Sequence, residues 1–361
     1  MQKRDVFLNA ANVICAPITM EATDVLAQDN LPVAFKSFNQ CVEKASFEQI
    51  MAHFDSLLAP VFSTLQLSKE QCANTTLLLG STSLDISAVQ IGDNDDLWLS
   101  KTDKISQALV AKYGLAALEF TFSTACTASA NACLYASRLI SQGSIEHALV
   151  IGCEFYNPLT VEGFKSLDLI SKTGLNAFAK SRSGLVLGEG LGALYLSATP
   201  NSQCLLKVLG GASSCDTYSL TMTKEDGSHI AQVINDAMRQ SQVTANTIDL
   251  IKVHGTATLG NDEAESNALT QIFIDNRPAI VAFKPFTGHT LGACGVIEIA
   301  LFNQFIAKSI PFLPIPEYVN NEGVELMWPF YDNEKTPSIN TILFNYFGFG
   351  GNNAALVLQR V

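Results

Sequence analysis

Short apolar runs alternate along the chain with longer stretches whose apolar positions recur with the period of a helix. The short runs, bounded by turn residues, predict buried strands, and the longer pattern predicts helices with one apolar face. The expected strands are Thr76–Leu79, Ala148–Ile151, Ala193–Leu196, Leu205–Leu209, Leu250–Val253, Ile280–Phe283, Thr341–Tyr346 and Ala354–Leu358. The expected helices are Phe47–Phe62, Asp103–Tyr113, Thr127–Ser141, Ile230–Ser241, Asp262–Phe273 and Leu291–Ile306. This alternation predicts an α/β fold with helices on both faces of the strands.

A turn-rich segment, Ala198–Ser202, is the main seam in the chain and divides it into residues 1–200 and 201–361. The two parts resemble each other weakly. Ala125–Ala130 and Gly288–Ala293 each follow an apolar strand region and open a helix of small residues with few charges. Because a helix that is apolar on all sides is a buried helix, we predict a duplicated fold with two central helices, each starting at a reactive group.

The composition indicates a folded protein with a partner. Hydrophobic residues make up 48% of the 361 residues and charged residues only 16%, whereas about 25% is usual. Disorder is excluded by the apolar content, and so few charges predict that a partner subunit covers much of the surface. The net charge is −12, and no run of Lys or Arg occurs, which argues against nucleic acid or an anionic membrane as a ligand.

The nine cysteines are odd in number and form no CxxC motif, which predicts reduced thiols and a cytoplasmic protein. The N-terminal segment makes a poor signal peptide, and no window approaches the ~20 apolar residues of a membrane span. We expect no metal site, because the chain has no HExxH motif and no close His/Cys cluster. A nucleotide site has little support, because Gly184–Gly190 lacks the required glycine spacing.

Four features could carry chemistry. Cys126 stands where a strand gives way to a helix, and the helix N-terminus is expected to lower the pKa of its thiol and favour the thiolate. His254 follows the apolar strand Leu250–Val253, and His289 follows a glycine; such loops face ligands in α/β proteins. The glycines of Phe347–Asn353 would let backbone N–H groups approach a ligand. Taken alone, each feature also fits a structural role.

Taken together and in order, seven segments resemble the β-ketoacyl-acyl carrier protein synthases of the thiolase superfamily. They are Ser123–Ser129, Ile151–Glu154, Gly184–Gly190, His254–Thr258, Asn261–Glu265, Lys284 with Gly288–Thr290, and Asn345–Gly351. The resemblance runs from about residue 75 to residue 361. It implies a thiolase-like, five-layered αβαβα fold of two similar halves, with the nucleophile in residues 1–200 and both histidines in residues 201–361.

The resemblance also implies a role for individual residues. Cys126 would take the acyl group from a carrier-protein thioester, and its backbone N–H and that of Phe349 would form the oxyanion hole. His254 and His289 would hold the malonyl carbonyl and assist decarboxylation, supported by Lys284. The other implied residues are the structural supports Glu265, Asp262 and Glu189 and the pantetheine contacts Thr256, Thr258, Phe349 and Gly350.

The implied reaction is a decarboxylative Claisen condensation of the acyl group on Cys126 with malonyl-acyl carrier protein. Its product is 3-oxoacyl-acyl carrier protein, in fatty acid or in polyketide or polyene chain elongation. No bound cofactor is implied, since the phosphopantetheine arm of the carrier brings the substrate. The implied partners are acyl carrier protein and a second subunit, identical or related. Lys165, Lys172, Lys180 and Arg182 cluster in the sequence and are candidates for docking an acidic carrier.

Two alternatives stay open. A non-catalytic partner subunit of the chain-length-factor type usually lacks the nucleophile, which this chain retains at Cys126. The other alternative is a related acyltransferase or thiolase that uses coenzyme A. Biosynthetic thiolases replace one histidine and add a second cysteine near the C-terminus, whereas this chain keeps both histidines and has Phe349 in the glycine-rich motif. The sequence departs from the family at Ala177–Ala179, Leu259 and Asn352, and its first ~70 residues lack the usual glycine-rich opening strand. These departures favour a specialised type II pathway.

Overall fold

The computed structural model describes residues 3–18, 35–41, 45–84, 86, 104–172, 174–310 and 339–361. Its strands are β1 (Phe7–Cys15), β2 (Phe35–Lys36), β3 (Thr75–Gly80), β4 (Glu119–Phe122), β5 (His147–Glu154), β6 (Leu187–Gly188), β7 (Gly190–Ser197), β8 (Leu206–Cys215), β9 (Leu250–Lys252), β10 (Ala279–Val281), β11 (Thr341–Gly348) and β12 (Asn352–Arg360). Its helices are α1 (Phe47–Leu65), α2 (Lys69–Ala73), α4 (Lys104–Tyr113), α5 (Ala128–Ser141), α6 (Pro158–Ser166), α7 (Ser228–Gln240), α8 (Leu259–Ile272), α9 (Lys284–Thr287) and α10 (Cys294–Ala307).

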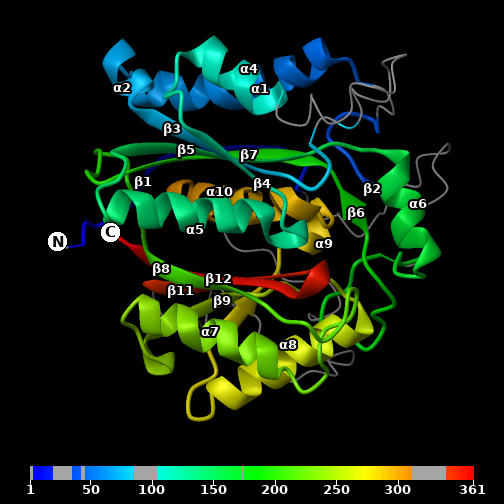
Figure 1. The fold of residues 1–361 in the computed structure, drawn as a ribbon. Coiled ribbons are helices and arrows are strands. Elements are labelled where there is room, and N and C mark those ends of the chain that lie inside the picture. The colour runs from blue at the N-terminus through cyan, green and yellow to red at the C-terminus, as the bar shows by residue number, and fades with distance from the viewer. Residues whose placement is uncertain are drawn as a thin grey trace.

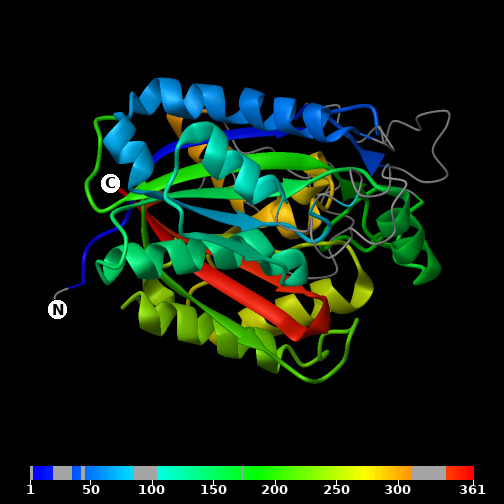
Figure 2. The same cartoon turned by 45° about the horizontal axis from the view of Figure 1, so that its top comes forward.

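The elements form five layers (Figure 1). Helices α1 and α4 cover one outer face, and α7 and α8 cover the other. Between them lie two groups of strands, one containing β1, β3, β5 and β7 and the other β8, β9, β11 and β12, with α5 and α10 sandwiched in the middle. Figure 2 shows α1 and α4 side by side over the first group of strands. The expected α/β fold with five αβαβα layers is therefore confirmed.

Within the described residues, ten of the strands form one hydrogen-bonded order, β10-β9-β11-β12-β8-β1-β7-β5-β3-β4, and β2 and β6 form a separate parallel pair. The two groups meet where Phe7 and Leu8 of β1 pair with Lys207 and Leu206 of β8. The pairs β3–β4, β3–β5, β9–β10 and β9–β11 are parallel, and the remaining pairs of this order are antiparallel. All eight expected strands are present, and so are the six expected helices, apart from Asp103, which lies outside the described residues.

Strand β1 corrects one expectation, because the sequence pattern predicted no strand before Thr76. Two asparagines interrupt its apolar run, and asparagine is unfavourable in strands. In the structure both amides are satisfied by neighbouring elements. Asn9 Nδ2 donates to Ser197 Oγ at 2.7 Å, and Asn12 Nδ2 donates to the carbonyl of Leu57 at 2.8 Å. These bonds offset the cost of burying polar side chains on a strand that lies between β7 and β8.

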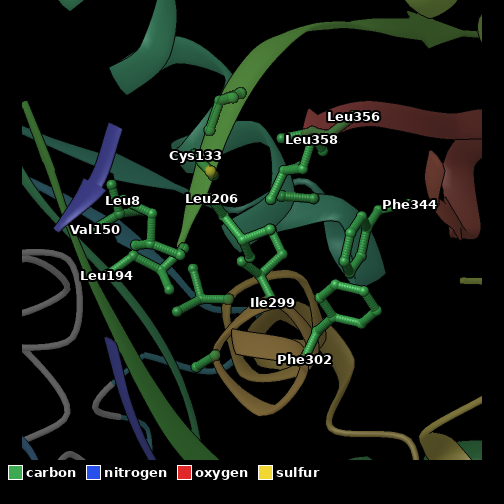
Figure 3. Close-up of a cluster of buried hydrophobic side chains, with 14 of the residues drawn as sticks. Leu8, Cys133, Val150, Leu194, Leu206, Ile299, Phe302, Phe344, Leu356 and Leu358 are labelled. Carbon is green, nitrogen blue, oxygen red and sulfur yellow. The ribbon is translucent and has the colours of Figure 1, made fainter. Parts of the chain in front are cut away.

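The two central helices touch through their backbones. A Cβ added at Gly295 of α10 would lie 2.2 Å from the backbone nitrogen of Ala130 in α5, so only glycine fits. Ser129 Oγ accepts a hydrogen bond from the backbone N–H of Val296 at 3.1 Å. Small residues thus let α5 and α10 approach closely, as the sequence predicted. Apolar side chains from both groups of strands close around them, as Figure 3 shows for Ile299 and Phe302 of α10.

The similarity between the two halves has a different register from the one the sequence suggested. Each central helix follows a short 3₁₀ turn, Ala125–Thr127 before α5 and Leu291–Ala293 before α10. Both turns begin with a residue of positive φ, 49° at Ala125 and 44° at Leu291. Gly292 therefore occupies the place of Cys126 in the second half, and His289 precedes the turn. The expected reactive group lies at the start of α5 itself but only near the start of α10.

Candidate active site

Cys126 lies in the 3₁₀ turn between β4 and α5 and is 6% exposed. Ala125, just before it, holds a left-handed conformation that is costly for a residue with a Cβ, and such strain clusters at functional sites. The backbone of the β11–β12 hairpin passes close to this turn, because a Cβ at Gly348 would lie 3.0 Å from the Cys126 nitrogen. The turn thus fixes the thiol against the glycine-rich hairpin.

The thiol of Cys126 is neutral at rest, contrary to the expectation from the helix N-terminus. Burial raises its pKa to about 12, while the charge of Lys284 and hydrogen bonds from the backbone N–H groups of Phe349 and of Cys126 lower it. Glu154 raises it further. Loss of hydration outweighs the favourable groups because the site is almost closed to water. A base is therefore needed to take the proton when the sulfur attacks.

The imidazole of His289 lies where such a base is needed. Its Nε2 lies 3.1 Å from the sulfur of Cys126. The residue follows α9 and Gly288, whose φ of 70° turns the chain. Its backbone N–H donates to the carbonyl of Val186 at 2.7 Å, and its carbonyl accepts from Gly188 at 3.0 Å. The glycine-rich segment 184–190 therefore clamps the histidine loop.

His254 lies beside His289, with the ring centroids 5.4 Å apart and the planes at 86°. It follows β9, and its loop is held by Glu265 on α8. One oxygen of Glu265 accepts the backbone N–H of His254 at 2.9 Å, and the other accepts that of Gly255 at 3.0 Å. Burial raises the pKa of Glu265 to about 7, and these backbone bonds act in the opposite direction. The expected supporting role of Glu265 thus has a direct geometric basis.

Asp262 holds the next part of the same loop. Its carboxylate accepts the backbone N–H of Phe178 at 2.7 Å and that of Ala257 at 3.2 Å. Ala257 has a φ of 62°, so this bond restrains a strained residue. Burial raises the pKa of Asp262 to about 6. The segment 177–179, where the sequence departs from the pattern it otherwise resembles, is therefore tied to the His254 loop.

Both imidazoles are neutral in this environment. Burial lowers the pKa of His254 and of His289 well below its usual value, and the positive charges of Lys284 and Lys252 lower both further. A neutral imidazole can donate its N–H hydrogen bond to a developing negative charge, and as a fixed dipole it needs no reorganisation at that moment. The pair is suited to stabilising an enolate.

Lys284 belongs to a buried group of three charged side chains, with Lys252 and Glu298. Its Nζ donates to Oε1 of Glu298 at 2.9 Å, and Lys252 Nζ donates to the other oxygen of the same carboxylate. All three side chains are at most 1% exposed. The attraction of Glu298 raises the pKa of Lys284 although burial lowers it. Sequence reasoning missed Lys252 and the role of Glu298, although Glu298 is the only charged residue between Thr290 and Ala300.

A cavity of about 310 Å³ opens onto Cys126, His254 and His289, while Lys284, Lys252 and Glu298 lie outside its lining. Its lining includes Cys126, His254, His289, Thr256, Thr258, Phe349 and Gly350. Thr256 and Thr258 bring their hydroxyls within 3.0 Å of each other on this wall. The ring of Phe349 stacks on Phe164 of α6, with centroids 5.4 Å apart. Seven of the expected site residues therefore share one cavity.

Glu189 lies outside the lining of this cavity and holds a different part of the fold together. Its carboxylate accepts hydrogen bonds from the backbone N–H groups of Tyr156 at 2.9 Å and Asn39 at 3.0 Å, and from the hydroxyl of Ser37. It joins the segment around β2 to the end of β5. Among the described residues, no group of three or more His, Cys, Asp or Glu side chains could hold a metal ion. Over the same part of the chain, no helix has the length and apolar character needed to cross a membrane.

The basic cluster expected to dock a carrier is only partly available. Lys165, Lys172 and Lys180 are exposed. Arg182 is wrong as a surface contact, since it is 6% exposed and its guanidinium donates to the carbonyl of Ala179 at 3.0 Å. The positive charge of Arg182 acts instead on buried Asp262.

Comparison with known proteins agrees with this geometry. The model of the N-terminal domain of β-ketoacyl synthases matches residues 76–201, and the model of the C-terminal domain matches residues 205–311. Together they span the nucleophile turn and both histidines. The chain belongs to the β-ketoacyl synthase family.

Curated relatives carry the same family name. The chain is 30% identical over 268 residues to 3-oxoacyl-acyl-carrier-protein synthase 2 of Vibrio cholerae, an alignment that covers 69% of this chain and 64% of that protein. It is 31% identical over 257 residues to the corresponding protein of Synechocystis sp., covering 66% and 60%. The chain spans less than two thirds of the length of these relatives.

Solved structures share the fold over the whole chain. A ketosynthase in complex with its chain length factor from Xenorhabdus doucetiae matches with a TM-score of 0.79 at 22% identity, covering 99% of this chain and 98% of that one. A β-ketoacyl synthase from Burkholderia phymatum matches with a TM-score of 0.75 at 20% identity, covering 99% and 100%.

Proposed function

We propose that the protein condenses an acyl group, carried on Cys126, with malonyl-acyl carrier protein to give 3-oxoacyl-acyl carrier protein. The observation that carries this proposal is the contact of 3.1 Å between Cys126 Sγ and His289 Nε2, with His254 beside it in one cavity. A thiol next to a neutral base is suited to acyl transfer, and a pair of neutral imidazoles is suited to an enolate.

In the first half-reaction, His289 Nε2 takes the proton of Cys126 as the sulfur attacks the carbonyl of the carrier thioester. The backbone N–H groups of Cys126 and Phe349 stabilise the oxyanion, each contributing about 3 kcal/mol by analogy with other acyl-transfer sites. The carbon–sulfur bond to the carrier then breaks, and the carrier thiolate takes the proton from His289. The products are acyl-Cys126, a neutral imidazole and the free carrier thiol.

In the second half-reaction, the bond between the malonyl carboxylate and its α-carbon breaks and carbon dioxide leaves. The electron pair stays as an enolate, whose oxygen accepts hydrogen bonds from His254 and from the tautomer of His289 that carries its single proton on Nε2. The enolate carbon attacks acyl-Cys126, the carbon–sulfur bond breaks, and the released thiolate takes a proton from water. The phosphopantetheine arm of the carrier brings both substrates, and Thr256 and Thr258 on the cavity wall are suited to contact it.

Transfer to Cys126 is tested by intact mass spectrometry after incubation with acyl-carrier thioesters of several chain lengths. We expect a mass increase equal to one acyl group, no increase for Cys126→Ala, and an unchanged increase for the control Cys72→Ala. Cys72 lies on α2, away from the cavity lining. The absence of an adduct with every chain length would contradict condensation and favour a non-catalytic partner subunit.

We further propose that a second subunit docks along β4. This strand pairs with β3 alone and ends the order of the sheet in the described residues. Leu118 is 55% exposed beside it, and Tyr135, 44% exposed on α5, packs against Phe122. An apolar sheet edge of this kind favours pairing with another chain. Light scattering is expected to give twice the chain mass for the unmodified protein. For Tyr135→Glu it is expected to give a single chain mass. A single chain mass for the unmodified protein would contradict a homodimer.

A further inference from the structure

Lys252 is a buried charge that the proposed reaction does not use directly. It lies on β9, two residues before His254, and its side chain is fully buried. Its ammonium has three neighbours: the carboxylate of Glu298, the carbonyl of Asn345 at 2.7 Å and the ring of Tyr346, whose centroid is 3.5 Å away. Burying a lysine is costly, and an apolar side chain of similar volume would pack here without that cost. The charge therefore calls for an explanation beyond packing.

Two chains of hydrogen bonds lead from Lys252 to the histidines. On one side, the Asn345 side chain donates to Glu265 at 3.2 Å, and Glu265 accepts the backbone N–H of His254. On the other side, Glu298 accepts from Lys284, whose carbonyl accepts the N–H of Gly288 at 2.9 Å. Gly288 immediately precedes His289. Lys252 is thus the point at which the two histidine loops are joined.

Among the groups in direct contact at this point, two positive charges face one carboxylate. Lys252 and Lys284 share the carboxylate of Glu298, so that contact pairs only one of the two buried ammonium charges behind the imidazoles. The next carboxylate, Glu265, acts on Lys284 from a distance. Glu265 faces the His254 loop, and the other titratable groups packed nearby are Cys126, Cys294 and Tyr346. Burial lowers the pKa of Lys252 to about 8 and Glu298 opposes this, so the ammonium is charged at neutral and acidic pH.

We propose that Lys252 is a positioning residue that joins the loops of His254 and His289 and places behind them one positive charge more than the contacting carboxylate of Glu298 can pair. That charge disfavours the imidazolium form of both rings and so keeps them as neutral donors toward the enolate. This inference rests on the proposed condensation for its meaning in catalysis. The effect of the Lys252 charge on protonation of the two imidazoles does not depend on whether the protein catalyses the condensation.

The experiment compares the unmodified protein with Lys252→Gln, Lys252→Met and Lys252→Arg. The first two remove the charge with little change in volume, and the third keeps it. Lys207→Gln, at a half-buried lysine of β8, makes the same change in net charge outside the cavity lining. Thermal unfolding identifies the variants that fold. NMR titration of the histidine ring signals measures protonation of the imidazoles in the absence of substrate. Release of carbon dioxide from malonyl-carrier protein between pH 5 and 8 measures activity.

In the neutral variants we expect the pKa values of His254 and His289 to rise by roughly one unit, because a buried positive charge has been removed. The acid limb of the decarboxylation profile moves to higher pH by the same amount, and KM is unchanged. Lys252→Arg and Lys207→Gln keep the profile of the unmodified protein. Unshifted ring signals in a folded neutral variant would overturn the role of Lys252. If the neutral variants shift as expected in the titration but the unmodified protein releases no carbon dioxide, that result would instead contradict the proposed condensation.

Discussion

Replacing His254 with alanine is expected to lower the rate of malonyl-carrier decarboxylation about a thousandfold. Transfer of the acyl group to Cys126 should remain measurable, because the ring in contact with the sulfur is that of His289. His254 instead lies beside His289, in a loop fixed through the backbone by Glu265. Its loss removes one donor to the enolate and leaves the thiol and its base in place.

The matched variant is His289→Ala, which removes the base as well as a donor and is expected to slow both half-reactions. Rates of acyl-adduct formation by intact mass and rates of carbon dioxide release, measured on the same two variants, separate the roles. Equal losses of acyl transfer in His254→Ala and His289→Ala would refute the division of labour between the two rings.

A second large effect is expected at the contact between the central helices. Gly295→Ala places a Cβ 2.2 Å from the backbone nitrogen of Ala130 and 2.7 Å from its Cα, where no side-chain rotation relieves the clash. The helices α5 and α10 must move apart, and we expect the free energy of unfolding to fall by about 3 kcal/mol or more. Denaturant unfolding measures this change.

Gly163→Ala is the control for that substitution. Gly163 lies in α6, and an added Cβ there would meet no atom within 4 Å. Alanine favours a helix over glycine, so this variant should be more stable by up to about 1 kcal/mol. A Gly295→Ala protein as stable as Gly163→Ala would show that the central helices are not packed as described.

The hydrophobic pattern predicted the central layers well, because strands buried on both faces and helices of small residues leave a strong periodic signal. It failed at β1, where Asn9 and Asn12 look unfavourable until their distant partners, Ser197 and Leu57, are known. Propensity is a local property, whereas hydrogen bonding across the fold is not. The division at residue 200 stays a prediction.

The sequence predicted which residues form the candidate site but not the protonation states of those residues. The motifs brought Cys126, His254 and His289 together, and the structure places them in one cavity. The state of the thiol could not be predicted from the helix N-terminus, because burial dominates its pKa. Lys252 escaped notice because a single lysine in a strand carries no motif. Its importance lies in partners contributed by α10 and β11.

The nucleophile and its base come from segments 163 residues apart in the chain. The N–H of Phe349 reaches the sulfur from a hairpin that follows both of them. During synthesis on the ribosome, Cys126 therefore emerges long before the groups that activate it. Until the β11–β12 hairpin has been made and packed against the turn, Cys126 lacks the Phe349 N–H, so the site is complete only once the last strands are in place.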